Sequence, residues 1–179
     1  MISFLSPFIL SFLLVCASTN GLSEISNIKA SEEITISGFS SGGAMATQML
    51  VAHSSVIKGA GIFAAPPYFC TRGIIANMKD CITNGFTVFV AELILAAQGF
   101  ENFGLIDKLS NLQNSKVYFF SGELDSVVWP GVVKDNENFF RKLGADVQSE
   151  YGLAAEHNFP TDFFGHKCSN LGKPFINNC

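Results

Sequence analysis

The sequence predicts an α/β fold with a mostly parallel sheet, and three observations support this prediction. Segments with strand character alternate along the chain with segments of helical periodicity. One strand segment, residues 116–120, is almost continuously apolar, which is typical of strands covered on both faces of a parallel sheet. The 179 residues are 48% hydrophobic and 15% charged, which excludes an intrinsically disordered chain and suits one domain with a sizeable core.

The first half of the chain predicts a strand, a helix and a second strand in turn. Residues 33–37 are rich in β-branched side chains and precede Gly38, so we expect a strand that ends in a sharp turn. Residues 42–53 follow with apolar side chains at four-residue spacing, which is typical of a helix. Residues 58–65 are apolar and are closed by two prolines, which predicts a buried strand. Residues 68–84 are expected to form a loop.

The middle of the chain predicts two helices before the apolar strand at residues 116–120. These helices are expected at residues 86–97 and 105–112, with Gly99 and Gly104 in the stretch between them.

The last predicted helix begins at Pro130, carries its apolar residues on one face and ends at Gly144. Residues 146–151 predict a final short strand, and the tail from His157 to Cys179 is expected to lack regular structure. The whole order indicates parallel strands joined by crossover helices.

The N-terminus predicts export from the cell. Residues 8–17 form an apolar run, followed by small and polar residues at 18–21, which is typical of a secretory signal peptide. We therefore expect residues 1–21 to be removed, leaving residues 22–179 as one domain of a secreted protein with no stable membrane span. A short membrane anchor is the alternative, although the run is short for a bilayer. The net charge of −4 and the lack of a basic stripe exclude nucleic-acid binding by bulk electrostatics.

Four cysteines remain after the predicted cleavage, an even number in a chain that enters an oxidising compartment. They allow three pairings, and loop closure favours Cys70 with Cys81 and Cys168 with Cys179. The competing interpretation is a metal site built from Cys168 and Cys179 with His157 and His166. Its spacing matches no zinc pattern, so we expect disulfides and no metal or organic cofactor.

One motif carries chemistry. Gly38-Phe39-Ser40-Ser41-Gly42 matches G-x-S-x-G, and it lies between a predicted strand and a predicted helix, as a nucleophile elbow requires. We expect side chains at either glycine to collide with backbone, and the Ser40 hydroxyl to point outward as a nucleophile. The helix N-terminus would aim the backbone N–H of Ser41 at a developing oxyanion. The alternative is an ordinary Gly/Ser-rich turn.

A serine nucleophile needs a base and an acid that orients the base. Asp125 follows the strand at 116–120, and His157 follows the strand at 146–151, so both are expected at the same sheet edge as Ser40. Glu123 is an alternative acid. His53, on the helix after the elbow, and His166, beside Lys167, are expected at the surface, which leaves His157 as the base.

Several segments resemble the secreted polyhydroxybutyrate depolymerases. The similar segments are residues 36–46, residues 63–70, Phe120-Ser121-Gly122-Glu123-Leu124-Asp125 with Val128-Trp129-Pro130, Glu156-His157-Asn158-Phe159-Pro160-Thr161-Asp162, and residues 175–179. The resemblance implies an α/β-hydrolase-like three-layer sandwich. It also implies a secreted serine esterase acting on short-chain hydroxyacid polyesters or related esters, and it carries over Ser40, Asp125 and His157 as the triad.

The chain departs from that family in one respect. The depolymerases that it resembles are circularly permuted, so several strands and a His-Gly-Cys oxyanion loop follow the histidine segment. This sequence holds no His-Gly pair and stops at Cys179. We therefore expect an incomplete sheet with an unpaired edge and an exposed apolar face. The alternative function is a truncated, non-catalytic secreted relative, either a binding product or an incomplete gene model.

Overall fold

Four parallel strands form the main sheet, in the order β1 (Ile34–Phe39), β2 (Ile57–Phe63), β3 (Lys116–Phe120) and β4 (Asp146–Glu150). The computed structural model describes residues 31–83 and 88–179. The predicted signal peptide lies outside the described residues, as does the predicted start of a helix at Phe86. No helix in the described ranges is long and apolar enough to cross a bilayer.

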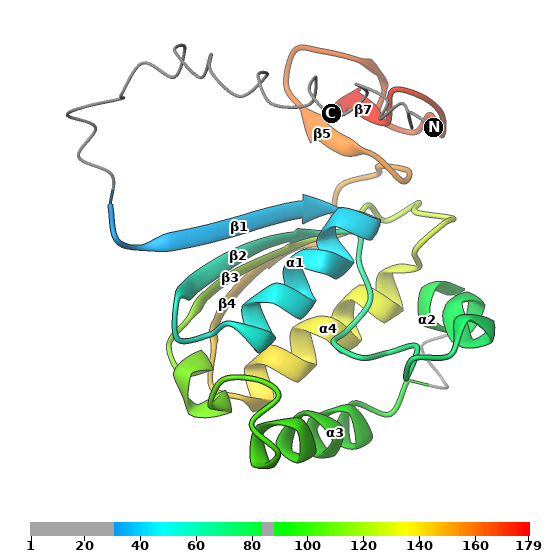
Figure 1. The fold of residues 1–179 in the computed structure, drawn as a ribbon. Helices are drawn as coiled ribbons and strands as arrows, with labels where there is room; N and C mark the ends of the chain where they lie inside the picture. The colour runs from blue at the N-terminus through cyan, green and yellow to red at the C-terminus, as the bar shows by residue number, and fades with distance from the viewer. Residues whose placement is uncertain (1–30, 84–87) are drawn as a thin grey trace, which may run out of the picture. The chain divides into compact units, whose positions relative to one another are not determined.

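The helices that join these strands pack on one side of the sheet (Figure 1). Helix α1 (Ser41–Ala52) packs on β1 and β2, and α4 (Pro130–Lys142) packs on β3 and β4. Between β2 and β3 lie α2 (Met78–Thr83) and α3 (Val90–Asn102), and α3 packs on α4. When neighbouring parallel strands follow one another in sequence order, right-handed crossovers place every helix on the same face.

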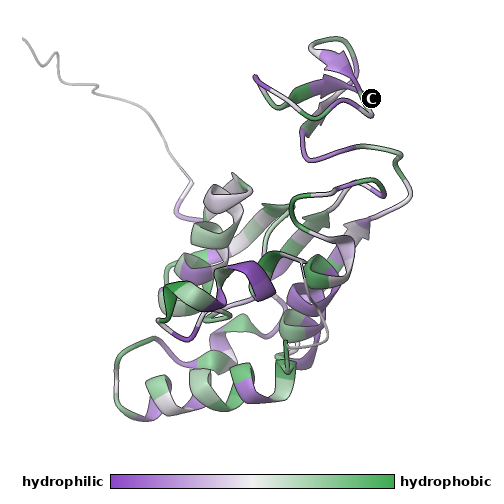
Figure 2. Ribbon diagram, turned by 90° about the vertical axis from the view of Figure 1, so that its right-hand side faces the viewer, coloured by the Kyte–Doolittle hydropathy of each residue, from purple (hydrophilic) through white to green (hydrophobic). Residues whose placement is uncertain are grey.

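The helix-covered face of the sheet is apolar. Ile36, Ala60, Val117 and Val147 lie in register across the four strands on this face. They pack with Leu50, Val51, Val132, Val133, Phe139 and Phe140, which are all fully buried. Figure 2 shows the corresponding hydrophobic colouring along the strands and helices of this region. The apolar periodicity of α4 is thereby explained. The expectation that residues 116–120 are covered on both faces is wrong, because Val117 and Phe119 are buried under the helices while Lys116 and Tyr118 on the other face are exposed.

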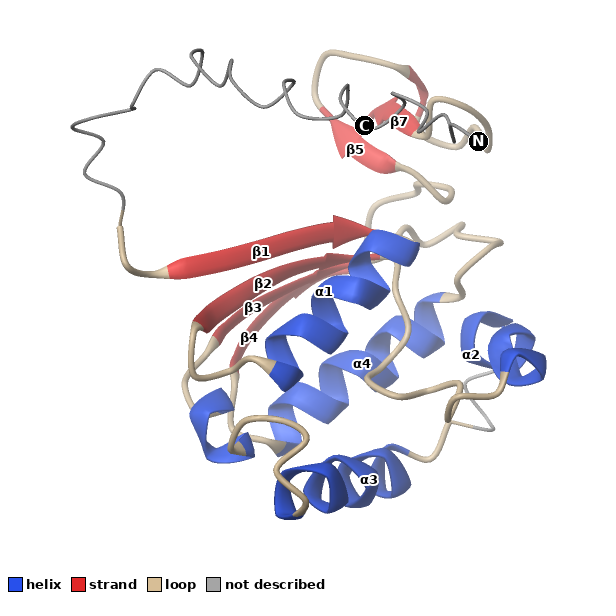
Figure 3. Ribbon diagram, viewed as in Figure 1, coloured by secondary structure: helices blue, strands red, loops and turns tan. Residues whose placement is uncertain are grey.

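Much of the opposite face of the sheet is lined by small and polar side chains. Thr35, Gly59, Lys116 and Asp146 form one row across the strands, and Ser37, Gly61, Tyr118 and Gln148 form the next. These residues line a cavity of about 510 Å³. No helix of the described residues covers this face, so those residues form two layers of the expected sandwich (Figure 3). The expectation of an exposed apolar face holds only in part, because these two rows are mostly glycine, hydroxyl and charged residues, whereas Phe39, Phe63 and Phe120 form the next row at the carboxyl ends of the strands.

Two predicted segments differ from the structure between β2 and β3. The expected loop at 68–84 contains a short 3-10 helix, Ile75–Asn77, and α2, and the disulfide between Cys70 and Cys81 closes it. The expected helix at 105–112 is only a 3-10 turn, Leu109–Leu112. Here the Asp107 carboxylate accepts hydrogen bonds from the backbone and hydroxyl of Ser55, which hold the chain in a non-helical path.

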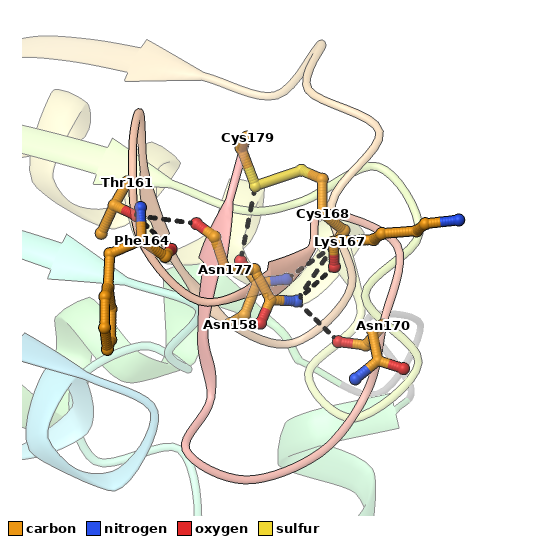
Figure 4. The surroundings of a disulfide bond; sticks show 8 residues. All are labelled: Asn158, Thr161, Phe164, Lys167, Cys168, Asn170, Asn177 and Cys179. Atoms are coloured by element: carbon orange, nitrogen blue, oxygen red, sulfur yellow. Dashed lines mark hydrogen bonds between the residues drawn. A yellow bond between two sulfur atoms is a disulfide. The ribbon is translucent and has the colours of Figure 1, made fainter.

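The predicted irregular tail forms a second, small sheet. Strands β5 (Phe159–Thr161), β6 (His166–Lys167) and β7 (Ile176–Asn178) pair in parallel in the order β5-β7-β6. Such strands carry no visible periodicity, because each has only two or three residues. The buried Asn177 side chain ties the loops together by donating to the carbonyl oxygens of Lys167 at 2.8 Å and Asn170 at 2.7 Å (Figure 4).

The four cysteines of the described chain form the two local disulfides. Cys168 is bonded to Cys179 within the small sheet, and Cys70 is bonded to Cys81 beside α2 (Figure 4 shows the former). Cys168 and Cys179 are therefore not free thiolates, and the alternative metal site is not formed. In the described ranges no other group of histidine, cysteine and acidic residues is arranged to hold a metal ion.

Candidate active site

The turn between β1 and α1 holds Ser40 in an unusual backbone conformation. Its φ of 57° and ψ of −119° lie in a region that non-glycine residues rarely adopt. The turn is fixed on both sides, because the N–H of Ser40 donates to the carbonyl oxygen of Phe63 at 2.9 Å and the N–H of Ala44 donates to that of Ser40 at 2.9 Å. The strand-to-helix geometry expected of a nucleophile elbow is present.

The glycines of this turn do not contribute equally. A Cβ at Gly38 would lie 2.1 Å from the carbonyl oxygen of Gly42, so only glycine fits there. A Cβ at Gly42 would meet nothing within 4 Å, so the steric reason that the sequence suggested for this glycine is wrong. Gly43 is the second glycine that close packing requires, since a Cβ there would lie 2.7 Å from the Cβ of Ala65.

Three side chains from separate parts of the sequence form a hydrogen-bonded chain at the carboxyl ends of the strands. The Nε2 atom of His157 lies 2.9 Å from the Ser40 Oγ. The Nδ1 atom of the same ring lies 2.9 Å from Oδ2 and 3.1 Å from Oδ1 of Asp125. Asp125 and His157 are each only 4% exposed, so the pair is shielded from water. This arrangement can move a proton from the serine to the imidazole.

The Asp125 carboxylate is oriented by its own loop. Its Oδ1 atom accepts hydrogen bonds from the backbone N–H groups of Val127 at 3.0 Å and Val128 at 2.8 Å. The loop itself pairs with the segment after β4, because the N–H of Leu124 donates to the carbonyl oxygen of Ala155 at 3.0 Å. The two segments approach so closely that a Cβ at Gly122 would lie 2.1 Å from that same oxygen.

Aromatic rings support the imidazole. The ring of Phe39, the variable residue before Ser40 in the motif, lies 4.6 Å from the His157 ring between centroids. The Phe175 ring lies 6.5 Å away in an edge-on arrangement. Phe159 packs on Phe63 at 4.8 Å, so the histidine segment also rests on the end of β2. The motif predicts none of these contacts, because its variable position carries no residue preference.

Glu156 connects the two loops that carry Asp125 and His157, and sequence reasoning missed it. Its Oε2 atom accepts hydrogen bonds from the backbone N–H of His157 at 2.9 Å and from the backbone N–H of Ser126 at 3.1 Å. Burial raises the pKa of this carboxyl, but the hydrogen bonds from His157 and Ser126 outweigh burial and leave the pKa below its ordinary value. Glu156 is therefore held as a carboxylate.

Asn136 is a second residue that sequence reasoning missed. It is fully buried on α4, and its Nδ2 atom donates to the Thr47 hydroxyl at 3.1 Å and to the carbonyl oxygens of Ala65 at 3.3 Å and Pro66 at 2.9 Å. It thus fixes the loop that packs behind the nucleophile turn. A signal was present, since a polar residue within the apolar face of a helix indicates a buried hydrogen bond.

The alternative site residues lie elsewhere. Glu123 is exposed. His53 is exposed at the end of α1, and His166 is exposed in the small sheet. Ser41 is the first residue of α1, directly after the turn. The cavity on the open face of the sheet is lined by none of the three hydrogen-bonded side chains, so the two features are separate.

Two curated relatives match most of this chain. It is 40% identical over 151 residues to a poly(3-hydroxybutyrate) depolymerase of Delftia acidovorans, covering 82% of this chain and 31% of that protein. It is 34% identical over 154 residues to a polyhydroxybutyrate depolymerase of Talaromyces funiculosus, covering 82% of this chain and 44% of that protein. The chain thus spans less than half the length of the relatives it matches. No protein-family model matches it.

Solved structures agree with these relatives. The crystal structure of a PHB depolymerase from Penicillium funiculosum superimposes with a TM-score of 0.74 at 30% identity, covering 83% of this chain and 47% of the other. A serine-to-alanine variant of a PHB depolymerase in complex with an R3HB trimer matches equally well. Over most of its length, this chain is a homologue of the polyhydroxybutyrate depolymerases, built on an α/β-hydrolase fold.

Proposed function

We propose that this protein is a secreted serine esterase that hydrolyses short-chain hydroxyacid esters of the polyhydroxybutyrate type. The observation that carries the proposal is the continuous hydrogen-bonded chain from Ser40 through His157 to Asp125. The relatives support the substrate class, because both are named as depolymerases of this polyester.

The geometry supports acyl transfer through a covalent intermediate. The Ser40 Oγ attacks the ester carbonyl carbon while His157 Nε2 accepts the hydroxyl proton. Asp125 holds the ring with its Nδ1 proton inward and stabilises the imidazolium that forms. The backbone N–H of Ser41, at the start of α1, donates to the developing oxyanion. His157 then protonates the leaving alcohol, and water releases the acyl group by the same steps in reverse.

Exposed apolar side chains lie on the segments next to the triad residues. Leu124 and Trp129 flank Asp125 in sequence and are 46% and 50% exposed, and Phe163 follows the histidine segment at 83% exposure. Such side chains favour an apolar polyester over a charged substrate. Two disulfides and the apolar run at residues 8–17 support secretion.

The test is labelling and hydrolysis with the purified mature chain. We expect a fluorophosphonate probe to label Ser40 and a short-chain p-nitrophenyl ester to be hydrolysed, with both signals lost in Ser40→Ala and His157→Ala. Asp125→Asn should lower kcat about 1,000- to 10,000-fold, because the imidazole would lose its orienting carboxylate. His166→Ala is the matched control and should keep both signals, since the His166 side chain is exposed and is hydrogen-bonded to the carbonyl oxygen of Lys173, away from the three triad side chains.

Folded wild-type protein whose Ser40 resists the probe would refute the catalytic proposal. That result would favour the alternative function, a secreted relative without catalysis.

A further inference from the structure

The Glu156 carboxylate lies at the junction between the acid-bearing loop and the base-bearing loop. One of its oxygens, Oε2, accepts from three donors: the N–H of His157 at 2.9 Å, the N–H of Ser126 at 3.1 Å and the Ser126 hydroxyl at 3.2 Å. Ser126 follows Asp125 in sequence, and Glu156 precedes His157. A single atom therefore joins the backbone beside the acid to the backbone beside the base.

The two loops are also joined on the other side of Asp125, where the N–H of Glu123 donates to the carbonyl oxygen of Leu153 at 2.8 Å. The N–H of Leu124 donates to the carbonyl oxygen of Ala155 at 3.0 Å, which attaches the acid loop just before Asp125. The Glu156 hydrogen bonds attach it just after Asp125. Attachments on both sides of Asp125 oppose rotation of the acid loop about the Leu124 contact and so restrain the distance between Asp125 and His157. Without the second attachment, the backbone after Asp125 would be held to the histidine segment only through the hydrogen bonds between the Asp125 carboxylate and the His157 ring.

We propose that Glu156 is a positioning residue, which sets the placement of the His157 imidazole against Asp125 and Ser40 by joining their two loops. This inference rests on the proposed esterase function for its kinetic consequence, but its structural part is independent of it. Misplacement of a reacting group by about 1 Å can cost about 100-fold in rate, so a joint of this kind has a measurable effect on the chemical step.

Two substitutions separate position from charge. All three donors bond to one oxygen, so the amide oxygen of Glu156→Gln can keep every hydrogen bond while the charge is lost. Glu156→Ala removes the acceptor entirely. We expect Glu156→Ala to lower kcat about 10- to 100-fold with KM unchanged within about 3-fold, and Glu156→Gln to restore kcat to within about 5-fold of wild type.

The matched control is Glu123→Ala. Glu123 lies on the same acid loop and is exposed, and only its backbone is bonded to the neighbouring segment. Its substitution should leave kcat within about 2-fold of wild type. Equal kcat for Glu156→Ala and wild type, a rise in KM with unchanged kcat, or a Gln variant as slow as the Ala variant would each overturn the inference.

Hydrogen exchange measured by mass spectrometry gives a readout that needs no catalysis. The N–H groups of Ser126 and His157 should exchange at least about 10-fold faster in Glu156→Ala, and near the wild-type rate in Glu156→Gln and Glu123→Ala. If the wild-type chain hydrolyses no ester, the proposed function fails while this exchange experiment still decides whether Glu156 joins the loops. Unchanged exchange in Glu156→Ala would refute the inference whatever the activity.

Discussion

Replacing Gly38 with alanine tests whether close packing at the nucleophile turn creates the conformation of Ser40. The added Cβ would lie 2.1 Å from the carbonyl oxygen and 2.2 Å from the carbonyl carbon of Gly42. Ordinary contacts between such atoms are about 3.5 Å, so the strand end and the helix start must separate by about 1.4 Å. Forced overpacking of this kind costs about 3 kcal/mol, and a displacement of about 1 Å at the nucleophile costs about 100-fold in rate.

The assay compares urea unfolding and phosphonate labelling of Gly38→Ala with those of the wild type. We expect the free energy of unfolding to fall by about 3 kcal/mol and the labelling of Ser40 to slow by about 100-fold. Gly42→Ala is the matched control for stability, because its Cβ would enter open space and alanine favours a helix by about 0.5 to 1 kcal/mol. A Gly38→Ala variant as stable as wild type, or a Gly42→Ala variant as unstable as Gly38→Ala, would refute the steric reasoning.

Two further predictions concern α4. Asn136→Ala should lower the free energy of unfolding by about 2 to 4 kcal/mol in urea titration, because it leaves the buried carbonyl oxygen of Ala65 and the part-buried carbonyl oxygen of Pro66 without this donor. Burial raises the pKa of Asp135 to about 6 from an ordinary 3.8, so the folded chain holds this proton more tightly than the unfolded chain. Stability contributed by Asp135 is thus present below pH 3.8 and is lost as the pH rises through about 6. As the pH is raised from 3.8 to about 6, the urea midpoint of Asp135→Asn should therefore rise relative to the urea midpoint of the wild type.

Both α4 predictions have simple controls. Asn138 lies on the same helix but is exposed, so Asn138→Ala should change stability by less than about 0.5 kcal/mol. A similar loss in both asparagine variants would contradict the role given to the Asn136 amide. For Asp135, a constant difference between variant and wild type from pH 4 to pH 7 would show that its pKa is the same in the folded and unfolded chains.

The main sheet and its helices could be predicted because their signals are local. The predicted strand at 116–120 matches β3 residue for residue, and the helix expected from Pro130 is confirmed as α4. The meeting of Ser40, Asp125 and His157 at one sheet edge also followed from chain order, since the carboxyl ends of parallel strands share an edge.

The remaining features depend on contacts that no local pattern records. The small sheet pairs strands of two or three residues, and Glu156 bonds to Ser126 across 30 residues. The motif also led to a wrong steric expectation for Gly42. The motif specifies a glycine at position 42, but the position where a Cβ would collide with its neighbours is Gly43.

The support of His157 by the small sheet has a consequence for the order of events during synthesis. Ser40 and His157 are 117 residues apart in the sequence. A ribosome that adds about 5 to 20 residues per second therefore synthesises His157 about 6 to 23 s after Ser40. The backbone next to the histidine then bonds to Cys168, whose sulfur partner is Cys179. Ser40 in the nascent chain therefore has no imidazole partner until the small sheet has been synthesised, and Cys168 and Cys179 must then be oxidised to each other, so assembly of the site should respond to the redox state of its surroundings.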